Sequence, residues 1–297
     1  MTLSHAHGEP RNPARIVVLG ASGFIGRRLL EACARRGIPA VGLTSRDLDL
    51  ADGAAAGALA DQLRPHDVLV FLAALTPDKG RDSGTLIRNL AMARAVCEAT
   101  RRTPVAQIVY ASSDAVYSFA TTLISEETPA AATDLYGAMH RVRELMLASE
   151  TKAPLAILRL TAIYGAGDTH NSYGTNRFLR QALSEQRIAL FGNGEETRDH
   201  LYVADAVALI LEVVTRGSTG LLNLATGTSA TFRAVAETIA ACSGRPVAIA
   251  PSARHNPVTH RHFDITNLLR AFPGVRFTSL AEGLAATFAG VRADNRG

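Results

Sequence analysis

The stretch Val17–Leu30, VVLGASGFIGRRLL, decides the fold. It joins an apolar β-type run, RIVVLG, to a helix expected from Phe24 to Arg36, and it carries glycines at positions 20, 23 and 26. Glycines in such a turn permit a tight bend and close backbone approach, so the N–H groups and dipole of the helix N-terminus can hold a pyrophosphate. Between a first strand and a first helix, the spacing G-x-x-G-x-x-G predicts a dinucleotide-binding turn.

The alternation of apolar runs and helical stretches extends over the first half of the chain. Continuous apolar strands alternating with helices predict an α/β fold with a parallel sheet covered on both faces. We expect a mobile tail over residues 1–14, a Rossmann-type NAD(P)-binding domain over 15–165 and a smaller α/β substrate lobe over 166–297, of which 199–224 returns to the first sheet. The expected strands are RIVVLG, IPAVGL, DVLVFLA, QIVYAS and PLAILRL, and the expected helices span 24–36, 54–63, 85–101, the stretch around Tyr136, 176–185, 203–214 and 231–241.

Size and composition indicate an ordinary globular protein, with 297 residues, 47% hydrophobic and 20% charged. The longest apolar runs are far shorter than the ~20 residues of a membrane span, and the polar start lacks the apolar core of a signal peptide. We therefore expect a cytoplasmic protein that does not enter the membrane. Cys33, Cys97 and Cys242 are too scattered for a disulfide framework or a cysteine metal site.

The charge pattern argues against nucleic acid as a partner. A net charge of +4 is spread along the chain, and aromatic residues make up only 5% with no Trp, which leaves no base-stacking platform. The segment ARHNPVTHRHFD holds His255, His260, His262 and Asp264, but their spacing does not match a structural zinc site. We expect no metal.

The end of the second expected strand bears on the choice of cofactor. A dinucleotide site that prefers NAD usually places an acidic group here, on the adenosine ribose. Thr44 and Ser45 carry no charge, and Arg46 can face a 2′-phosphate. This favours NADP over NAD modestly, although Asp47 follows directly and can serve NAD.

Tyr136 and His140 lie four residues apart in DLYGAMHRVREL, within an expected amphipathic helix. Residues at this spacing share one helix face, so the two side chains can act on one ligand. The alternative is that Tyr136 packs and His140 is solvated, and the pair alone leaves both interpretations open.

Taken together, these segments resemble the extended short-chain dehydrogenase/reductase family, in its branch of NAD-dependent epimerases and dehydratases that act on nucleotide sugars. The resemblance covers about residues 15–290. It implies a Rossmann domain with strand order 3-2-1-4-5-6, a C-terminal substrate lobe, and a homodimer packed through helices that include the Tyr136 helix. The residues that carry it are Gly20, Gly23, Gly26, FLAA at 71–74, Asn89, SSDAVY at 112–117, YGAMH at 136–140, FGNGEETRDHLYVADA, NLATG and LAEGLAAT.

The resemblance assigns catalytic positions residue by residue. Ser113 takes the place of the catalytic Ser/Thr and Tyr136 that of the general acid/base. Asp114 matches an Asp of the dehydratase subset, but Ala115 stands where that subset has Glu, so epimerisation or ketone reduction is favoured over loss of water. We expect cofactor contacts at Gly20, Gly23, Phe24, Ile25, Gly26, Ser45, Arg46, Asp49, Leu50, Ala73, Ala74, Asn89, Tyr136 and His140, and substrate contacts at Ser113, Asn176 and Arg198.

His140 departs from the family, which has Lys at this position. The lysine binds the nicotinamide ribose, and its charge lowers the pKa of the tyrosine; at ~5 Å and an effective dielectric of ~20 the two charges interact by roughly 3 kcal/mol, about two pKa units. A neutral His140 forfeits that help, although it can still hydrogen-bond the ribose or Tyr136, and protonation at lower pH would restore the charge. Two hypotheses follow: an epimerase or ketoreductase, and a weakly catalytic or non-catalytic dinucleotide sensor or scaffold.

Overall fold

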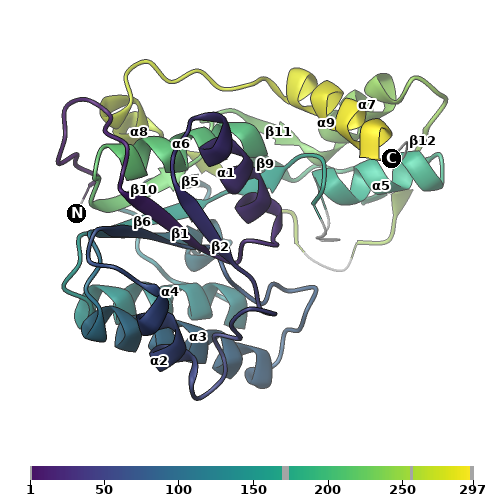
Figure 1. Ribbon diagram of the computed structural model, residues 1–297. Helices are drawn as coiled ribbons and strands as arrows, with labels where there is room; N and C mark the ends of the chain where they lie inside the picture. Colours follow the sequence, from purple (N-terminus) through teal and green to yellow (C-terminus); the bar gives the residue numbers. More distant parts are fainter. Residues whose placement is uncertain (1, 169–173, 255–256, 295–297) are drawn as a thin grey trace.

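The computed structural model describes residues 2–168, 174–254 and 257–294. Its centre is a six-stranded sheet in which every neighbouring pair of strands is parallel, in the order β10-β6-β4-β3-β1-β2 (Figure 1). The sequence DVLVF of β3 is buried at all five positions, as expected of a strand covered on both faces. The strands of this main sheet are β1 Arg15–Leu19, β2 Ala40–Leu43, β3 Asp67–Phe71, β4 Gln107–Ser113, β6 Leu155–Leu160 and β10 Gly220–Leu224.

Helices cover both faces of the main sheet (Figure 1). On one face lie α2 (Ala55–Gln62), α3 (Ser83–Arg102) and α4 (Leu135–Glu150), and on the other lie α1 (Phe24–Arg35) and α6 (Val203–Thr215). The arrangement confirms the predicted fold class, a Rossmann-type doubly wound parallel sheet.

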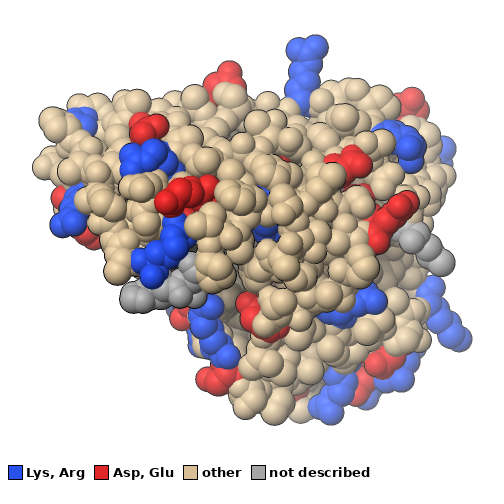
Figure 2. Space-filling model, turned by 180° about the vertical axis from the view of Figure 1, so that it is seen from behind, with Lys and Arg blue, Asp and Glu red and all other residues tan. Residues whose placement is uncertain are grey.

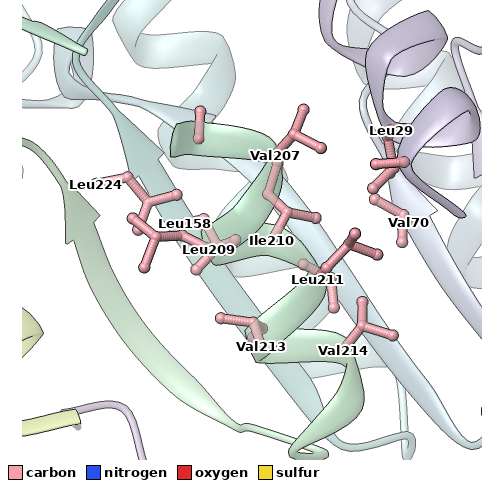
Figure 3. Packing of buried hydrophobic residues seen from close by; sticks show 14 of the residues in the cluster. Leu29, Val70, Leu158, Val207, Leu209, Ile210, Leu211, Val213, Val214 and Leu224 are labelled. Carbon is pink, nitrogen blue, oxygen red and sulfur yellow. The ribbon is translucent and has the colours of Figure 1, made fainter. Parts of the chain in front are cut away.

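Helix α6 is apolar around most of its circumference because it is enclosed in the core. Its buried residues share one hydrophobic cluster with Leu29 of α1, Val70 of β3, Leu158 of β6 and Leu224 of β10 (Figure 3). Burial of one such side chain contributes roughly 1.5–3 kcal/mol. This packing holds α6 and the following strand β10 on the main sheet, although they follow segments of the second lobe in the chain.

The predicted strand order 3-2-1-4-5-6 is wrong at the outer edge. After β2 the chain forms turns instead of an edge strand, so the order along the chain is 2-1-3-4-5-6. The carboxylate of Asp47 accepts hydrogen bonds from the backbone N–H and hydroxyl of Thr44, and Asp49 and Asp52 accept from backbone N–H groups two residues ahead. These local bonds occupy donors that an edge strand would have used.

The N-terminal segment lies along β10, a placement that its polar composition did not indicate. Ser4 and Thr219 exchange two backbone hydrogen bonds of 2.8 Å, and Thr2 bridges to Leu221. The ring of His5 lies between the hydroxyl of Ser218 and a backbone carbonyl oxygen. The segment thus covers the open edge of the main sheet, while its predicted mobility in solution stays a prediction.

A second, smaller lobe is built mainly from the last third of the chain (Figure 1). Its core joins α5, α7 and α9 with the two-stranded sheet β8–β12. A three-stranded sheet, β7-β9-β11, follows the main sheet and leads into this lobe. The remaining elements are η1 Asp114–Val116, β5 Leu123–Ile124, β7 Ala162–Tyr164, α5 Thr175–Ser184, β8 Arg187–Phe191, β9 Thr197–Tyr202, β11 Ser229–Thr231, α7 Phe232–Ser243, β12 Ala248–Ser252, β13 His262–Phe263, α8 Thr266–Ala271 and α9 Leu280–Asp294.

On the face shown in Figure 2, acidic and basic side chains are interspersed over a largely uncharged surface. In the part of the chain that the structure describes, no helix has the length and apolarity that crossing a membrane requires.

Candidate active site

The glycine-rich turn lies where β1 passes into α1, beside the end of β3. Gly20 has a φ of +88°, and a Cβ there would lie 2.8 Å from the backbone nitrogen of Ala73. A Cβ at Gly26 would collide with the carbonyl oxygen of Gly20. Both glycines are therefore required for α1 to start this close to the sheet.

The start of α1 fits a pyrophosphate group. Its N-cap residue is Gly23, with no side-chain cap, and its first turn contains no acidic residue. The first N–H groups of a helix have no partner within the helix, and residues 22–26 line a cavity of about 720 Å³. N–H groups, an uncapped helix dipole and space for an anion coincide here.

The loop after β2 borders the same cavity. Thr44 and Ser45 line it, whereas Arg46 is exposed and does not. The carboxylate of Asp47 is engaged by Thr44, and these hydrogen bonds lower its pKa. Asp49 lines the cavity wall and forms a 3.6 Å ion pair with Arg88 of α3.

The side chain of Asn89 holds the segment after β3 in place through its backbone at Leu75. Its side-chain amide donates to the carbonyl oxygen of Leu75 and accepts from the N–H of Leu75, both at 2.9 Å. Ala73 and Ala74 line the cavity, whereas Asn89 is buried and does not. The structure thus places Asn89 as a support for the cofactor groove and not as part of its wall.

Helix α4 brings Tyr136 to the end of β4, where Ser113 lies. Asp134 caps the helix by accepting a 2.8 Å hydrogen bond from the N–H of Gly137. Any Cβ at position 137 would collide with the carbonyl oxygen of Ala115, so Gly137 is what allows this close approach. Ser113 and Tyr136 both line the cavity.

Burial dominates the acidity of Tyr136. Desolvation and the nearby Asp114 raise its pKa to about 12, while Arg143 and the Ser113 hydroxyl act in the opposite direction. A phenol with this pKa is protonated at neutral pH. The ligand-free site therefore presents Tyr136 as a proton donor.

His140 is buried directly below Tyr136, and the two rings meet edge to face with centroids 4.7 Å apart. Its Nδ1 is 2.7 Å from the hydroxyl oxygen of Tyr110, and its Nε2 has no hydrogen-bond partner among the described residues. Burial first, and the charge of Arg143 second, lower the pKa of His140 well below its ordinary value. Protonation of His140, which is expected to restore the missing positive charge, is therefore moved to lower pH than for an ordinary histidine.

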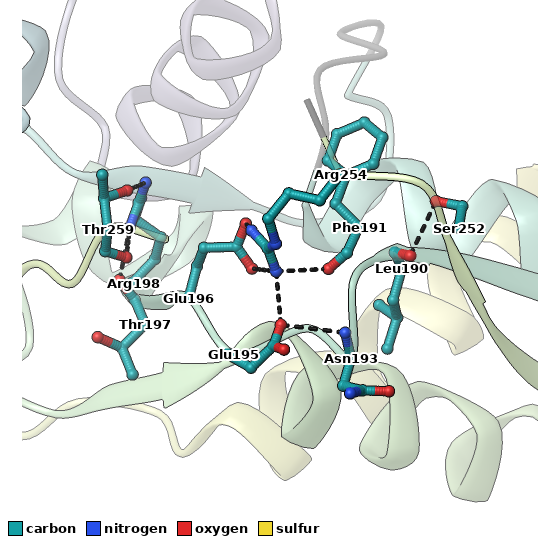
Figure 4. Close-up of polar contacts among 10 residues, drawn as sticks. All are labelled: Leu190, Phe191, Asn193, Glu195, Glu196, Thr197, Arg198, Ser252, Arg254 and Thr259. Carbon is teal, nitrogen blue, oxygen red and sulfur yellow. Dashed lines mark hydrogen bonds and ion pairs between the residues drawn. The ribbon is translucent and has the colours of Figure 1, made fainter. Parts of the chain in front are cut away.

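Two arginines and an aspartate also line the cavity, where they form a positive end. Arg198, on β9, donates to the carbonyl oxygen and hydroxyl of Thr259 (Figure 4). Arg261 is fully buried, donates to the carbonyl oxygen of Asp114 and lies 3.6 Å from its carboxylate. Burial raises the pKa of Asp114, which both arginines counteract. A positive end of this kind suits a phosphorylated ligand.

A separate ion-pair cluster borders this end. Arg254 pairs with Glu195 and Glu196 and donates to the carbonyl oxygen of Phe191 (Figure 4). The cluster joins the strand end at Phe191 to the segment before β9. It thereby stiffens the approach to Arg198.

One cavity brings together most of the residues expected from the sequence, and Arg46 and Asn89 are the two that do not line it. Asn176 is held by the N–H of Gly165 and the carbonyl oxygen of Ile163. The expected residues that line the cavity are Gly20, Gly23, Phe24, Ile25, Gly26, Ser45, Asp49, Leu50, Ala73, Ala74, Ser113, Asp114, Tyr136, His140, Asn176 and Arg198.

Other functional positions were not expected from the sequence. Tyr110 lies in a strand whose buried pattern gives no hint of a polar role, and His200 and Arg261 reach the cavity only through the tertiary fold. Gly137 directly follows Tyr136, and Arg143 shares its helix face at a spacing of seven. The positions of Gly137 and Arg143 relative to Tyr136 were therefore visible in the sequence.

Two expectations fall partly outside the described residues. The loop over residues 168–175, on whose shape we expect the choice of sugar to depend, includes positions 169–173, and the histidine-rich segment includes His255. Among residues 2–168, 174–254 and 257–294, no three His, Cys, Asp or Glu side chains gather as a metal site requires.

Comparison with known proteins identifies the family. The model of the NAD dependent epimerase/dehydratase family matches residues 16–225. The uncharacterized UDP-glucose epimerase YtcB of Bacillus subtilis (strain 168) is 26% identical over 230 residues, which cover 67% of this chain and 72% of that protein. The chain belongs to the NAD-dependent epimerase/dehydratase family of enzymes.

Solved structures agree over nearly the whole length. MoeE5 in complex with UDP-glucose and NAD superposes with a TM-score of 0.81 at 26% identity, covering 95% of this chain and 99% of that chain. A GDP-L-fucose synthetase from Naegleria fowleri has a TM-score of 0.85 at 17% identity and covers 100% of this chain and 98% of its own. At 17% identity the second match shows the fold alone.

The buried His200 predicts a specific loss of stability in acid. Burial and the charge of Arg198 lower its pKa from 6.5 to about 4. Between those values the unfolded chain binds a proton that the folded protein does not, so the free energy of unfolding falls as pH drops from 6.5 to 4, by about 3 kcal/mol for this residue. In urea unfolding measured across this range, His200→Gln should flatten the decline by about that amount.

His66→Gln, at an exposed position, is the matched control and should retain the wild-type pH slope. Equal slopes in all three proteins would show that His200 is not held neutral by the fold.

Proposed function

We propose that the protein is an NAD(P)-dependent epimerase or ketoreductase that acts on a nucleotide-linked sugar. One observation carries the proposal: a single cavity is lined by the glycine cradle, by Ser113 and Tyr136 and by Arg198. These are the groups that a dinucleotide, a reacting sugar carbon and a diphosphate would each need. The complex of MoeE5 with UDP-glucose and NAD supports the same pair of ligands.

The protein's part in the reaction is proton transfer and orientation. The bound nicotinamide supplies the hydride exchange with a sugar carbon. Tyr136 moves the proton of the sugar hydroxyl, and Ser113 polarises the same oxygen. Because Tyr136 is protonated at neutral pH, the ligand-free site is set to donate a proton to a carbonyl oxygen, which is the direction of ketone reduction. Net consumption of NADPH distinguishes a reductase from an epimerase.

The competing function is a weakly catalytic or non-catalytic dinucleotide sensor or scaffold. His140 favours it, because the lysine that ordinarily assists the tyrosine is absent. The pairing of Tyr136 with Ser113 in one cavity and the two arginines that line it favour an enzyme, since a sensor of dinucleotide alone has no use for them.

Replacement of Tyr136 by Phe separates the two functions. General acid–base catalysis contributes roughly 10²–10⁴-fold, so Tyr136→Phe should lower kcat by at least about 100-fold with little change in KM. The assay follows turnover of a panel of nucleoside-diphosphate sugars with NAD or NADPH. Tyr202→Phe is the control, since Tyr202 lies outside the cavity wall. Absence of turnover by the wild type across the panel, with cofactor binding intact, would favour the sensor.

Arg46 provides a test of cofactor preference. Thr44 and Ser45 line the groove and Arg46 follows at the surface, so a 2′-phosphate on the adenosine ribose lies within its reach in our proposal. A charge-assisted hydrogen bond contributes about 1.5–3 kcal/mol, so calorimetry should show Arg46→Glu weakening NADP⁺ binding by roughly tenfold to a hundredfold and NAD⁺ binding far less.

Arg36→Glu makes the same charge change at an exposed position at the opposite end of α1 and should leave both affinities unchanged. Equal losses for the two cofactors in Arg46→Glu would remove Arg46 from the binding site. A wild type that binds neither cofactor would overturn the proposed function.

We also propose a homodimer packed through α3 and α4. These adjacent helices expose large apolar side chains: Ile87 on α3, 65% exposed, and Leu135, Val142 and Leu145 on α4, the last 51% exposed. Positions 135, 142 and 145 share one helix face. An exposed apolar stripe of this kind fits a self-complementary contact with a second copy.

Leu145→Asp should therefore convert the dimer to a monomer, measured as a halving of mass by light scattering. Leu269→Asp, at an exposed leucine on α8, should leave the mass unchanged. A monomeric wild type would contradict the dimer.

A further inference from the structure

Arg143 is a cation enclosed in the protein behind the proposed catalytic groups. It lies on α4, three residues after His140 and seven after Tyr136, and its side chain is 0% exposed. Its guanidinium donates to the carbonyl oxygen of Asn89 at 2.9 Å and 2.6 Å and to that of Ala73 at 2.8 Å. It also lies over the ring of Phe71, 4.9 Å from the centroid.

The partners of Arg143 are all uncharged. Besides the two carbonyl oxygens it contacts the amide oxygen of Asn89 and the sulfur of Met92, and within the described residues it forms no ion pair with a carboxylate. The neighbouring Glu144 is turned the other way, towards Arg159 and Ser112. Burying a charge without an opposite charge is costly. A purely structural tie between helices does not require a cation.

His140 is hydrogen-bonded to Tyr110, and the charge of Arg143 acts on both residues. The oxygen of the Tyr110 hydroxyl is 2.7 Å from Nδ1 of His140. A nearby cation favours the arrangement in which the lone pairs of the Tyr110 oxygen face it, so the hydroxyl directs its hydrogen to Nδ1. A neutral imidazole that accepts at Nδ1 carries its hydrogen on Nε2. Among the described residues Nε2 has no hydrogen-bond partner; it is a buried atom of a residue that lines the cavity.

We propose that Arg143 and His140 divide between them the two roles of the absent lysine. His140 presents Nε2–H to a ligand hydroxyl, in place of the ammonium donor. Arg143 supplies the fixed positive charge behind it and, through Tyr110, holds His140 in the tautomer that donates. Arg143 is thus a positioning residue for the proposed reaction, and its catalytic role rests on the proposed function.

The charges around these groups agree with this division. Tyr136 faces Asp114 and Asp134, which disfavour its ionised form, and Arg143 is the cation that favours it. Glu144 likewise disfavours the ionised form of Tyr110, and Arg143 favours it. At His140 the charged form is the protonated one, and Arg143 disfavours it. One buried cation therefore adds to the effect of burial in keeping the histidine neutral, and it also favours the ionised form of the tyrosine.

The first experiment needs neither cofactor nor substrate. Nitrogen NMR of the histidine rings reports which ring nitrogen carries the hydrogen, and His140→Gln identifies the signal of His140. The wild type should show His140 neutral with hydrogen on Nε2. Tyr110→Phe, which removes the linking hydroxyl and leaves Arg143 in place, should abolish that preference. A wild-type His140 that carries hydrogen on Nδ1, or that is charged near pH 7, would overturn the proposal.

The charge of Arg143 is tested by Arg143→Met and Arg143→Lys. Loss of the charge should raise the pKa of His140 by roughly one unit, and the lysine variant should retain the wild-type value. Packing lost in both variants would lower stability without producing this difference. If Arg143→Met does not fold, Tyr110→Phe still decides the tautomer. An unchanged His140 titration in a folded Arg143→Met protein would overturn the assigned charge role.

Turnover gives an independent readout once a substrate is found. Arg143→Met should raise the pH at which the Tyr136-dependent step becomes fast by roughly one unit, with kcat affected more than KM. His140→Lys should reduce activity in the wild type, because it adds a second buried cation, but should increase activity in Arg143→Met. A gain in both backgrounds would contradict the division of roles. The ligand-free NMR result stands even if the proposed reaction is wrong, so the two failures are distinguishable.

Discussion

The buried carboxylate of Glu144 is the interaction on which the site depends. It accepts hydrogen bonds from Arg159 of β6 at 2.8 Å and 2.7 Å and from Ser112 of β4 at 2.7 Å, and thereby ties α4 to two strands of the main sheet. Satisfied on both oxygens, the buried pair fixes the rotation of α4 about its axis. That rotation decides that Tyr136 and His140 line the cavity and that Arg143, on the same helix face, is enclosed behind them.

The fold class and much of the cavity follow from short-range patterns in the sequence. Apolar runs between helices predict a parallel sheet, and the glycines at 20, 23 and 26 predict where α1 starts because only glycine fits beside Ala73 and the carbonyl of Gly20. Tyr136 and Ser113 were assigned from the resemblance to the family, and each lies at one helix start or one strand end. In these cases one element determines the position of the residue.

Features that depend on several elements could not be predicted in this way. The missing edge strand results from aspartates that bind their own loop, and such local bonds compete with strand pairing by small free energies. Arg198 was found, but Arg261 reaches the same end of the cavity through a late segment with no regular pattern. The environment of His140 depends on a tyrosine thirty residues earlier, and its neutral state depends first on burial and second on the charge of Arg143.

Positions 140 and 143 constrain each other. With Arg143 buried among carbonyl oxygens, a lysine at 140 would be a second cation in the same apolar interior, and no carboxylate among the described residues pairs with Arg143 to offset it. A neutral ring at 140 avoids that repulsion and still leaves one ring nitrogen without a partner among the described residues. The histidine is therefore the residue that a buried arginine at 143 allows, and the departure from the family pattern is a consequence of where the positive charge lies.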